Sequence, residues 1–463
     1  MIPEGFAESV AQIVGPSFVR QDDSSLEAYG ADALKQTYRA DLVALPGSVS
    51  EVAAVAELCS ERVVPLVVRG AGTGQTGGSV PLRGGVVLSL ERLNRILEID
   101  QDNLLAVVEP HVRTGDLQEA VERVGLFYPP DPASLKDSVI GGNVAENAGG
   151  PRAFKYGTTR QYVLGLEAVL PSGEIIRTGS KAVKNVVGYD LTRLLVGSEG
   201  TLAIITQVVL RLIPKPPSRV TIRASFETLR QAVDAVSELL RARVVPATLE
   251  IIDGESLEAV RAYLHTSLAP PGTGAVLLIE ADGFAEAVAE ESRLVEAACR
   301  AAGATEVTRA ADEAAREELW RVRRELSPAL KAISERKLNS DVVVPRGRVP
   351  ELFDLVEEIR RDSGLPVACF GHAGDGNIHV NVMLDPLQPD APARGARAVR
   401  ALFEGVVALE GSISGEHGIG FSKAPYLSIE LAPAEIALMK RIKQVFDPRG
   451  ILNPGKIFPD SGQ

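Results

Sequence analysis

The stretch Arg69-Gly-Ala-Gly-Thr-Gly-Gln-Thr-Gly-Gly78 decides how the first half of the chain folds. Part of it matches the pattern GxGxxG, which serves a dinucleotide only when it opens a helix. Here Ser79-Val-Pro-Leu-Arg-Gly-Gly85 follows, which cannot begin that helix, and a strand comes next. The sequence therefore predicts a strand, a phosphate-binding loop rich in backbone amides, and a second strand. The alternative is a glycine-rich hairpin without a function.

The composition is that of a globular protein with more than one core. The chain has 463 residues, 45% apolar and 24% charged, and this length exceeds one ordinary domain. A net charge of -12 argues against a nucleic-acid partner. No apolar run approaches the roughly 20 residues of a membrane span. The N-terminus lacks the pattern of a signal peptide, so we expect a cytoplasmic protein without a membrane span.

The three cysteines, Cys59, Cys299 and Cys369, are far apart in the sequence. This spacing argues against both a disulfide framework and a cysteine-ligated iron–sulfur cluster. If the protein carries out redox chemistry, its electrons must therefore leave to an acceptor outside this chain.

Helix and strand patterns alternate along the chain. We expect a helix over 50–59, strands over 63–69 and 85–90, and a buried strand or pair of strands within 200–211. The glycine- and proline-rich segment 129–157 is expected to be a long ordered loop. After a linker at 213–217, strands over 220–226, 247–253, 275–281 and 305–308 and helices through 232–243 and 287–302 predict an antiparallel α+β sheet covered on one face by helices.

Three of the five histidines lie in two glycine-framed segments near the C-terminal end. A turn at 374–377 separates strands over 367–372 and 378–382, and strand alternation places His379 and Asn381 on one face. His372, His379 and Glu416 form the set of two imidazoles and one carboxylate that is typical of an open catalytic metal site. His417, with an imidazole pKa of about 6.5, is then expected to act as a base. Each histidine taken alone is more often a surface or packing residue.

Several segments, in this order, carry a resemblance to a known family. They are Arg69–Gly78, Ile140–Gly150, Tyr156-Gly157, Gly188–Leu191, Val196–Leu202, Gly371–His379, Gly415–Gly420 and Ile451–Lys456. From about residue 40 to the end, the chain resembles the D-2-hydroxyacid dehydrogenase branch of the vanillyl-alcohol oxidase and p-cresol methylhydroxylase flavoproteins. The resemblance implies an α+β fold with an FAD-binding domain over 1–215, a substrate domain with the metal site over 216–423, and a C-terminal segment over 424–463 that returns to the FAD-binding domain.

The resemblance also implies non-covalently bound FAD, because neither histidine nor cysteine lies between Arg69 and Gly78, where some relatives attach the flavin. The residues implied in FAD binding are Arg69, Gly70, Gly72, Thr73, Gly74, Thr76, Gly77, Asp131, Gly141, Gly142, Asn147, Gly149, Tyr156, Gly157, Glu199, Ile205 and Asn453. Ala203 stands where the family commonly has glycine, a change that removes no functional group.

The substrate implied by the resemblance is a small 2-hydroxy acid. A divalent metal (zinc, manganese or iron) is expected to lower the pKa of the hydroxyl group, with His417 taking the proton. Arg323 is expected to bind the carboxylate, with Ser327 one helical turn later and Asn381 beside His379. Arg323 as a solvated helix residue is the alternative. Relatives with long dicarboxylate substrates add a lysine where this chain holds Asn339, with Lys337 nearby, which favours D-lactate or glycolate over D-2-hydroxyglutarate.

The leading hypothesis is thus an FAD-linked dehydrogenase of a D-2-hydroxy acid. Its electrons are expected to pass to a quinone, a cytochrome, an electron-transfer flavoprotein or an iron–sulfur partner subunit, in a homodimer or a glycolate oxidase complex. D-2-hydroxyglutarate dehydrogenase is an alternative. A second is a transferase like alkyl-dihydroxyacetone-phosphate synthase, whose relatives carry consecutive histidines where this chain has Gly415-Glu416-His417. A third is a non-catalytic flavin-binding subunit, which would lack the complete His/His/Glu/His set.

Overall fold

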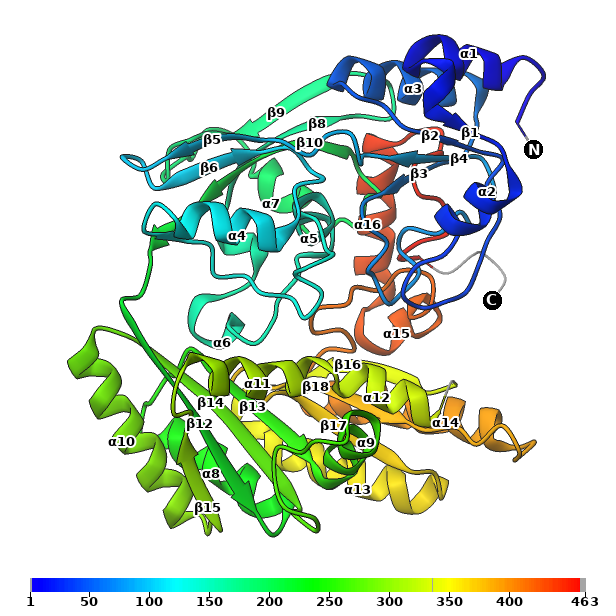
Figure 1. The fold of residues 1–463 in the computed structure, drawn as a ribbon. Coiled ribbons are helices and arrows are strands. Elements are labelled where there is room, and N and C mark those ends of the chain that lie inside the picture. Colours follow the sequence, from blue (N-terminus) through cyan, green and yellow to red (C-terminus); the bar gives the residue numbers. More distant parts are fainter. Residues whose placement is uncertain (1, 335, 459–463) are drawn as a thin grey trace. The chain divides into compact units, whose positions relative to one another are not determined.

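The computed structural model describes residues 2–334 and 336–458 and divides the chain into two compact units (Figure 1). The first unit comprises 1–149, 158–215 and 416–463, and the second comprises 150–157 and 216–415, within the described residues. Residues 416–423 belong to the first unit, whereas the sequence suggested a boundary after 423. The reason is local, because the backbone amides of Ile419 and Gly420 donate hydrogen bonds to Glu199, at 2.8 and 2.6 Å.

The first unit contains a four-stranded sheet of order β1-β2-β4-β3, a five-stranded sheet of order β5-β6-β10-β8-β9, and the pair β11-β7. The strands are β1 (Val19–Arg20), β2 (Leu42–Ala44), β3 (Leu66–Arg69), β4 (Val86–Ser89), β5 (Ile96–Asp100), β6 (Leu105–Val108), β7 (Leu126–Phe127), β8 (Val163–Val169), β9 (Ile175–Gly179), β10 (Ile204–Arg211) and β11 (Ile213–Pro214). The helices are α1 (Phe6–Val14), α2 (Asp23–Tyr29), α3 (Val49–Arg62), α4 (Thr114–Glu122), α5 (Ile140–Glu146), α7 (Leu191–Leu195), α15 (Leu427–Glu430) and α16 (Pro433–Phe446), with 3-10 turns η1 (Pro16–Phe18), η2 (Thr159–Gln161) and η4 (Ala424–Tyr426).

The glycine-rich stretch connects two strands, as predicted. Strands β3 and β4 are parallel neighbours, with Leu66 opposite Val86, and the loop over 70–85 joins them without a helix. The expectation for 129–157 was wrong, because this segment contains α5 and α6 (Ala153–Tyr156). Buried Ile140 and Val144, spaced one helical turn apart, supply the apolar face that stabilises α5 despite its two glycines.

The second unit is built on a seven-stranded sheet of order β15-β12-β14-β13-β17-β18-β16, in which every described pairing is antiparallel. This confirms the predicted antiparallel α+β class. The strands are β12 (Ser218–Phe226), β13 (Thr248–Asp253), β14 (Ala275–Gly283), β15 (Glu306–Arg309), β16 (Leu338–Val343), β17 (Val367–His372) and β18 (Asn377–Val382). The helices are α8 (Leu229–Arg241), α9 (Gly254–Leu264), α10 (Ala285–Ala301), α11 (Glu313–Arg324), α12 (Leu326–Ile333), α13 (Val349–Ser363) and α14 (Ala391–Ala408), with η3 (Arg346–Arg348).

Helices cover both faces of this sheet, so the expected single covered face was wrong. Figure 1 shows α11 and α12 along one side and α8, α10 and α13 along the other. On the first side, α9 and α12 pack on Ile252, Ala368 and Phe370 in one apolar cluster. These three residues alternate with others along β13 and β17, so they mark the face that also carries the polar residues of the candidate site. Within the described ranges, no helix combines the length and apolar character needed to cross a membrane.

Candidate functional site

The loop after β3 has the properties of an anion-binding cradle. Among the described residues, the backbone amides of Gly70, Gly72, Thr73 and Gly74 donate no hydrogen bond. A Cβ atom built at Gly74 would meet nothing within 4 Å, so the glycine there is not demanded by protein packing. Consecutive amides without protein acceptors are what a pyrophosphate group binds. The loop therefore fits the phosphate-binding role expected of it.

The far end of the cradle packs against the segment that carries His417. Thr76 donates its hydroxyl to the His417 carbonyl, at 3.0 Å, and accepts from the Phe421 amide through its own carbonyl, at 3.1 Å. Gly420 approaches so closely that a Cβ there would lie 2.1 Å from the Thr76 carbonyl oxygen. The predicted base and the predicted cofactor loop are thus parts of one packed structure.

Glu199 and Asn453 complete this packing. The Glu199 carboxylate accepts from the Ile419 and Gly420 amides, and burial raises its pKa although these two hydrogen bonds lower it. The Asn453 side chain donates to the carbonyls of Gly78 and Glu199, both at 2.8 Å. In the structure the Glu199 carboxylate supports the His417 segment, and its expected place near FAD stays a prediction.

The other residues expected near FAD lie in varied surroundings. Arg69 donates to the Ala31 carbonyl at 2.7 Å, and its guanidinium lies where a Cβ at Gly72 would fall. Asn147 accepts from Thr158 and from the Arg160 amide. A Cβ at Gly149 would lie 2.8 Å from Glu416 Oε2. Gly77 packs on Phe421, Gly141 packs on Pro110, Gly142 lies in α5, Asp131 lies between β7 and α5, and Ile205 is buried in β10.

Tyr156 and Gly157 fall in the segment 150–157, which belongs to the second unit. The Tyr156 hydroxyl donates to both carboxylate oxygens of Asp282, at 2.9 and 2.7 Å, and Lys155 forms an ion pair with the same carboxylate at 2.6 Å. Phe154 packs over Gly374 in the turn between β17 and β18. The Tyr156 side chain is therefore engaged by the substrate unit, and its role in lining FAD remains a prediction.

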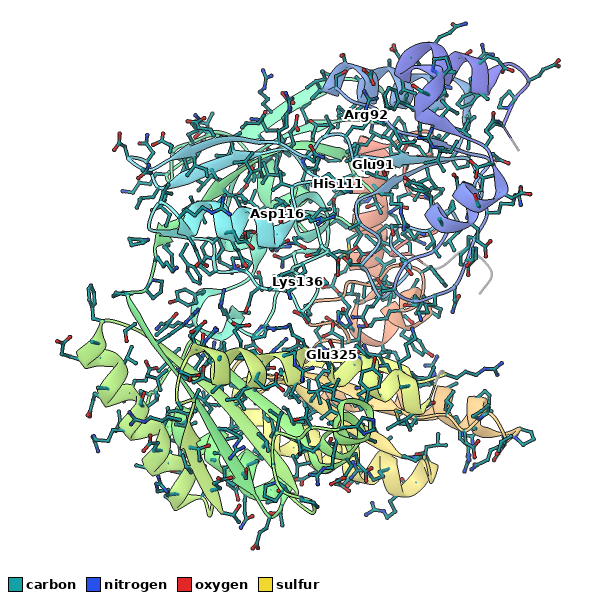
Figure 2. All side chains as sticks on the ribbon, viewed as in Figure 1. Glu91, Arg92, His111, Asp116, Lys136 and Glu325 are labelled. Atoms are coloured by element: carbon teal, nitrogen blue, oxygen red, sulfur yellow. The ribbon has the colours of Figure 1, made fainter. Side chains whose placement is uncertain are left out.

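His111 is a residue near the cradle that the sequence did not single out. Its imidazole lies close enough to the Gly70 backbone and to Glu91 for both to affect its pKa, and Figure 2 labels His111 beside Glu91. Burial lowers the pKa of His111, an effect that Glu91 and the Gly70 backbone oppose. The sequence around His111 carries no motif that would have identified it, because its neighbour Glu91 lies in a different segment.

The paired strands β17 and β18 bring the two predicted metal-binding histidines together. His379 lies opposite Phe370, and His372 lies opposite Asn377. The centroids of the His372 and His379 rings are 5.4 Å apart, and both side chains are buried. Asp341, on β16, lies opposite His379, with Oδ1 at 3.7 Å from the imidazole Nδ1.

Glu250 is the second residue that sequence reasoning missed. It is completely buried on β13, opposite His372 on β17. Its Oε1 lies 2.5 Å from His372 Nδ1, and its Oε2 accepts from Arg323 Nε at 2.6 Å. Burial raises the pKa of Glu250, but Arg323 and His372 outweigh it and lower that pKa to about 2. One ionised carboxylate therefore joins a predicted metal ligand to the predicted substrate arginine.

Ser327 and Asn381 meet at Lys337. The Lys337 ammonium donates to Ser327 Oγ at 3.0 Å and to Asn381 Oδ1 at 3.1 Å. Among the described residues, which leave out Glu335, no carboxylate pairs with it. Burial first, then the like charge of Lys331, lowers the pKa of Lys337 from 10.5 to about 8. A half-buried cation with neutral partners is a binding group for an anion.

Glu416 and His417 belong to the first unit, with His417 Nε2 at 3.9 Å from Glu416 Oε1. The histidines His372 and His379 belong to the second unit. The four residues are thus divided between the units, and their assembly into one metal site stays a prediction.

Comparison with known proteins identifies the family. A model described as FAD linked oxidases, C-terminal domain, matches residues 215–457, and an FAD binding domain matches residues 40–179. The chain belongs to the FAD-linked oxidase family. This oxidase is 43% identical to the glycolate oxidase subunit GlcD of Bacillus subtilis, over 99% of this chain and 97% of that protein. It is 37% identical to D-lactate dehydrogenase of Anaerostipes hadrus, over 96% of this chain and 95% of that protein.

Solved structures show the same fold at lower identity. This FAD-linked oxidase matches p-cresol methylhydroxylase with a TM-score of 0.82 and 19% identity, covering 99% of this chain and 98% of that one. It matches alkyldihydroxyacetonephosphate synthase with a TM-score of 0.76 and 19% identity, covering 98% of this chain and 86% of that one. The predicted fold class and the identity as an FAD-binding oxidoreductase are therefore confirmed.

Proposed function

We propose that this oxidase converts a small D-2-hydroxy acid, D-lactate or glycolate, to the 2-oxo acid with the help of a divalent metal. The observation that carries the proposal is the polar sheet face on which one carboxylate, Glu250, holds both His372 and Arg323. Relatives named glycolate oxidase subunit and D-lactate dehydrogenase, which match nearly the whole chain, support the substrate class.

The donor set fits a divalent cation. His372 has its Nδ1 on a carboxylate, which is the usual arrangement of a metal-ligating histidine, with Nε2 as the ligand atom. The Gly415 amide donates to Asp341 at 3.0 Å, and Glu416 follows Gly415 directly in the chain. Adjacent Cα atoms are about 3.8 Å apart, and this connectivity supports Glu416 as the proposed third ligand. His372, His379 and Glu416 would hold the ion.

In the proposed reaction, Arg323 and His417 have separate roles. Arg323 binds the substrate carboxylate, and His417 takes the proton of the hydroxyl group as the Cα–H bond breaks. A divalent ion held by His372, His379 and Glu416 would lower the pKa of that hydroxyl. The amides of the cradle would hold FAD, which would supply the hydride acceptor and pass two electrons to an acceptor outside this chain. Thr76 and Glu199 keep His417 in place through the hydrogen bonds described above.

A specific observation favours a second candidate substrate. Asn339 occupies the position expected for a lysine that binds a second carboxylate. Lys337, the residue just before β16, instead offers a cation there and donates hydrogen bonds to Ser327 and Asn381. A 2-hydroxy acid with two carboxylates, such as D-2-hydroxyglutarate, therefore has a cation to bind.

Rapid mixing of the oxidised enzyme with D- and L-2-hydroxy acids tests the proposal, with and without a chelator. We expect the flavin absorbance to bleach with a D-2-hydroxy acid and to bleach more slowly once the metal has been removed. Bleaching with none of these acids would overturn the proposed reaction. Undiminished bleaching after verified metal removal would overturn only the metal.

A further inference from the structure

Glu250 has two partners of different function on its two oxygen atoms. Its Oε1 is at 2.5 Å from His372 Nδ1, while Oε2 lies 2.6 Å from Arg323 Nε and 2.5 Å from Arg323 Nη2. The Arg323 guanidinium also lies over the Phe370 ring, at 4.8 Å from its centroid. The arginine is thus fixed from two directions, and the imidazole is fixed at one nitrogen.

A fixed Nδ1 determines what the other nitrogen of His372 can do. When a carboxylate accepts the Nδ1 proton, the neutral imidazole presents its lone pair at Nε2. The cross-strand pairing of Glu250 with His372 makes this choice part of the sheet register rather than of a flexible contact. The same register holds Arg323 beside the histidine.

We propose that Glu250 is a positioning residue that sets His372 as an Nε2 metal ligand and orients Arg323 toward the substrate carboxylate. The inference rests on the proposed metal-assisted oxidation and adds to it that metal binding and substrate binding depend on the same carboxylate. Because both partners share one carboxylate, loss of Glu250 weakens metal binding and substrate binding together.

The chain offers a matched control for a purely structural role. Glu280, on the neighbouring strand β14, is also buried and accepts from Arg316 Nε at 2.8 Å and Trp320 Nε1 at 3.1 Å. Arg316 and Arg323 both lie on α11. Removing Glu250 takes from buried Arg323 the carboxylate that it pairs with, and removing Glu280 takes from buried Arg316 one of its carboxylates, while Glu313 and Glu317 remain. Both changes should lower stability. Of these two glutamates, only Glu250 has a histidine among its described hydrogen-bond partners.

The test compares Glu250→Gln, Glu250→Asp and Glu280→Gln as FAD-loaded full-length proteins. Zn²⁺ affinity is measured by competition with a chromogenic chelator, and KM and kcat are measured separately. We expect Glu250→Gln to lose about 10- to 100-fold in Zn²⁺ affinity and to raise KM, while Glu280→Gln changes only the melting temperature. Equal Zn²⁺ affinities for the wild type and Glu250→Gln, or equal losses for both glutamine variants, would overturn the inference.

A measurement on the wild type covers the case in which the variants fail to fold. In Zn²⁺-loaded protein with ¹⁵N-labelled histidine, we expect His372 to carry its proton at Nδ1. The opposite tautomer contradicts the inference. If wild-type protein binds no Zn²⁺, the proposed metal site itself fails; the Glu250 inference fails with it only if KM is also unchanged in Glu250→Gln.

Discussion

Replacing Lys337 by methionine tests whether the ammonium faces the substrate. An ammonium group has three N–H donors, and Ser327 and Asn381 occupy two of them. One donor remains for a carboxylate, and a hydrogen bond to a charged group contributes about 1.5–3 kcal/mol. Since about 1.4 kcal/mol corresponds to a factor of ten, Lys337→Met should lower kcat/KM about 10- to 150-fold. Methionine keeps most of the apolar stem, so the folded structure should persist.

The assay compares kcat/KM for D-lactate, glycolate and D-2-hydroxyglutarate in the wild type, in Lys337→Met and in Arg336→Met, an exposed neighbour that serves as the control. A loss confined to D-2-hydroxyglutarate would assign Lys337 to a second carboxylate. A loss shared with D-lactate would assign it to the carboxylate next to the hydroxyl group. Unchanged kcat/KM for every acid would refute the reasoning.

The pH dependence of KM in the wild type and in a further variant, Lys337→Arg, gives an independent check. The pKa of Lys337 is lowered by burial to about 8, so the ammonium loses its proton as the pH rises through that value. KM should therefore rise above pH 8 in the wild type but not in Lys337→Arg, since a guanidinium keeps its charge. The unfolded chain, with a lysine pKa of 10.5, binds the proton more tightly than the folded protein between pH 8 and 10.5. This group should make the free energy of unfolding rise with pH in that window.

Three further predictions concern the flavin and the base. Gly74→Ala should keep the melting temperature of the apoprotein, because its Cβ meets nothing within 4 Å, yet weaken FAD binding; Gly77→Ala, whose Cβ would lie 2.0 Å from Phe421, should lower the melting temperature. His417→Asn should lower kcat about 10²- to 10⁴-fold with unchanged FAD content, and a near-normal kcat would remove His417 as the base. Acid precipitation should release the yellow flavin to the supernatant, and flavin retained in the pellet of the wild type but not of His111→Ala would show a covalent bond at that histidine.

The sequence predicts those parts of the site that lie within one short segment. The cradle, the turn at 374–377 and the placement of His379 and Asn381 on one face of a strand follow from local spacing. Glu250 could not be predicted, because His372 lies 122 residues and Arg323 lies 73 residues away from it. No local pattern encodes which strand becomes the neighbour of β13, and only that pairing gives Glu250 its partners.

For two segments, 129–157 and 150–157 within it, the structure differs from the prediction for an identifiable physical reason. The glycines of 129–157 suggested an irregular loop, but glycine is also required where a helix packs closely on another segment, as Gly141 does on Pro110. Segment 150–157 was expected to belong to the FAD-binding domain by its place in the sequence. Instead Lys155 and Tyr156 bind Asp282 of the second unit, a contact across more than a hundred residues that spacing alone cannot indicate.

The contacts also divide the reaction between the two units. In the first unit, Thr76 binds the His417 backbone and Glu199 holds the amides that follow it, so the proposed FAD cradle and the segment of the proposed base depend on the same hydrogen bonds. In the second unit, Glu250 joins the predicted metal ligand to the predicted substrate arginine. One set of hydrogen bonds therefore joins the proposed FAD cradle to the segment of the proposed base, and another joins the proposed metal ligand His372 to the proposed substrate arginine. A variant within either set should disturb two functions at once, whereas a variant such as Gly74→Ala should disturb only one.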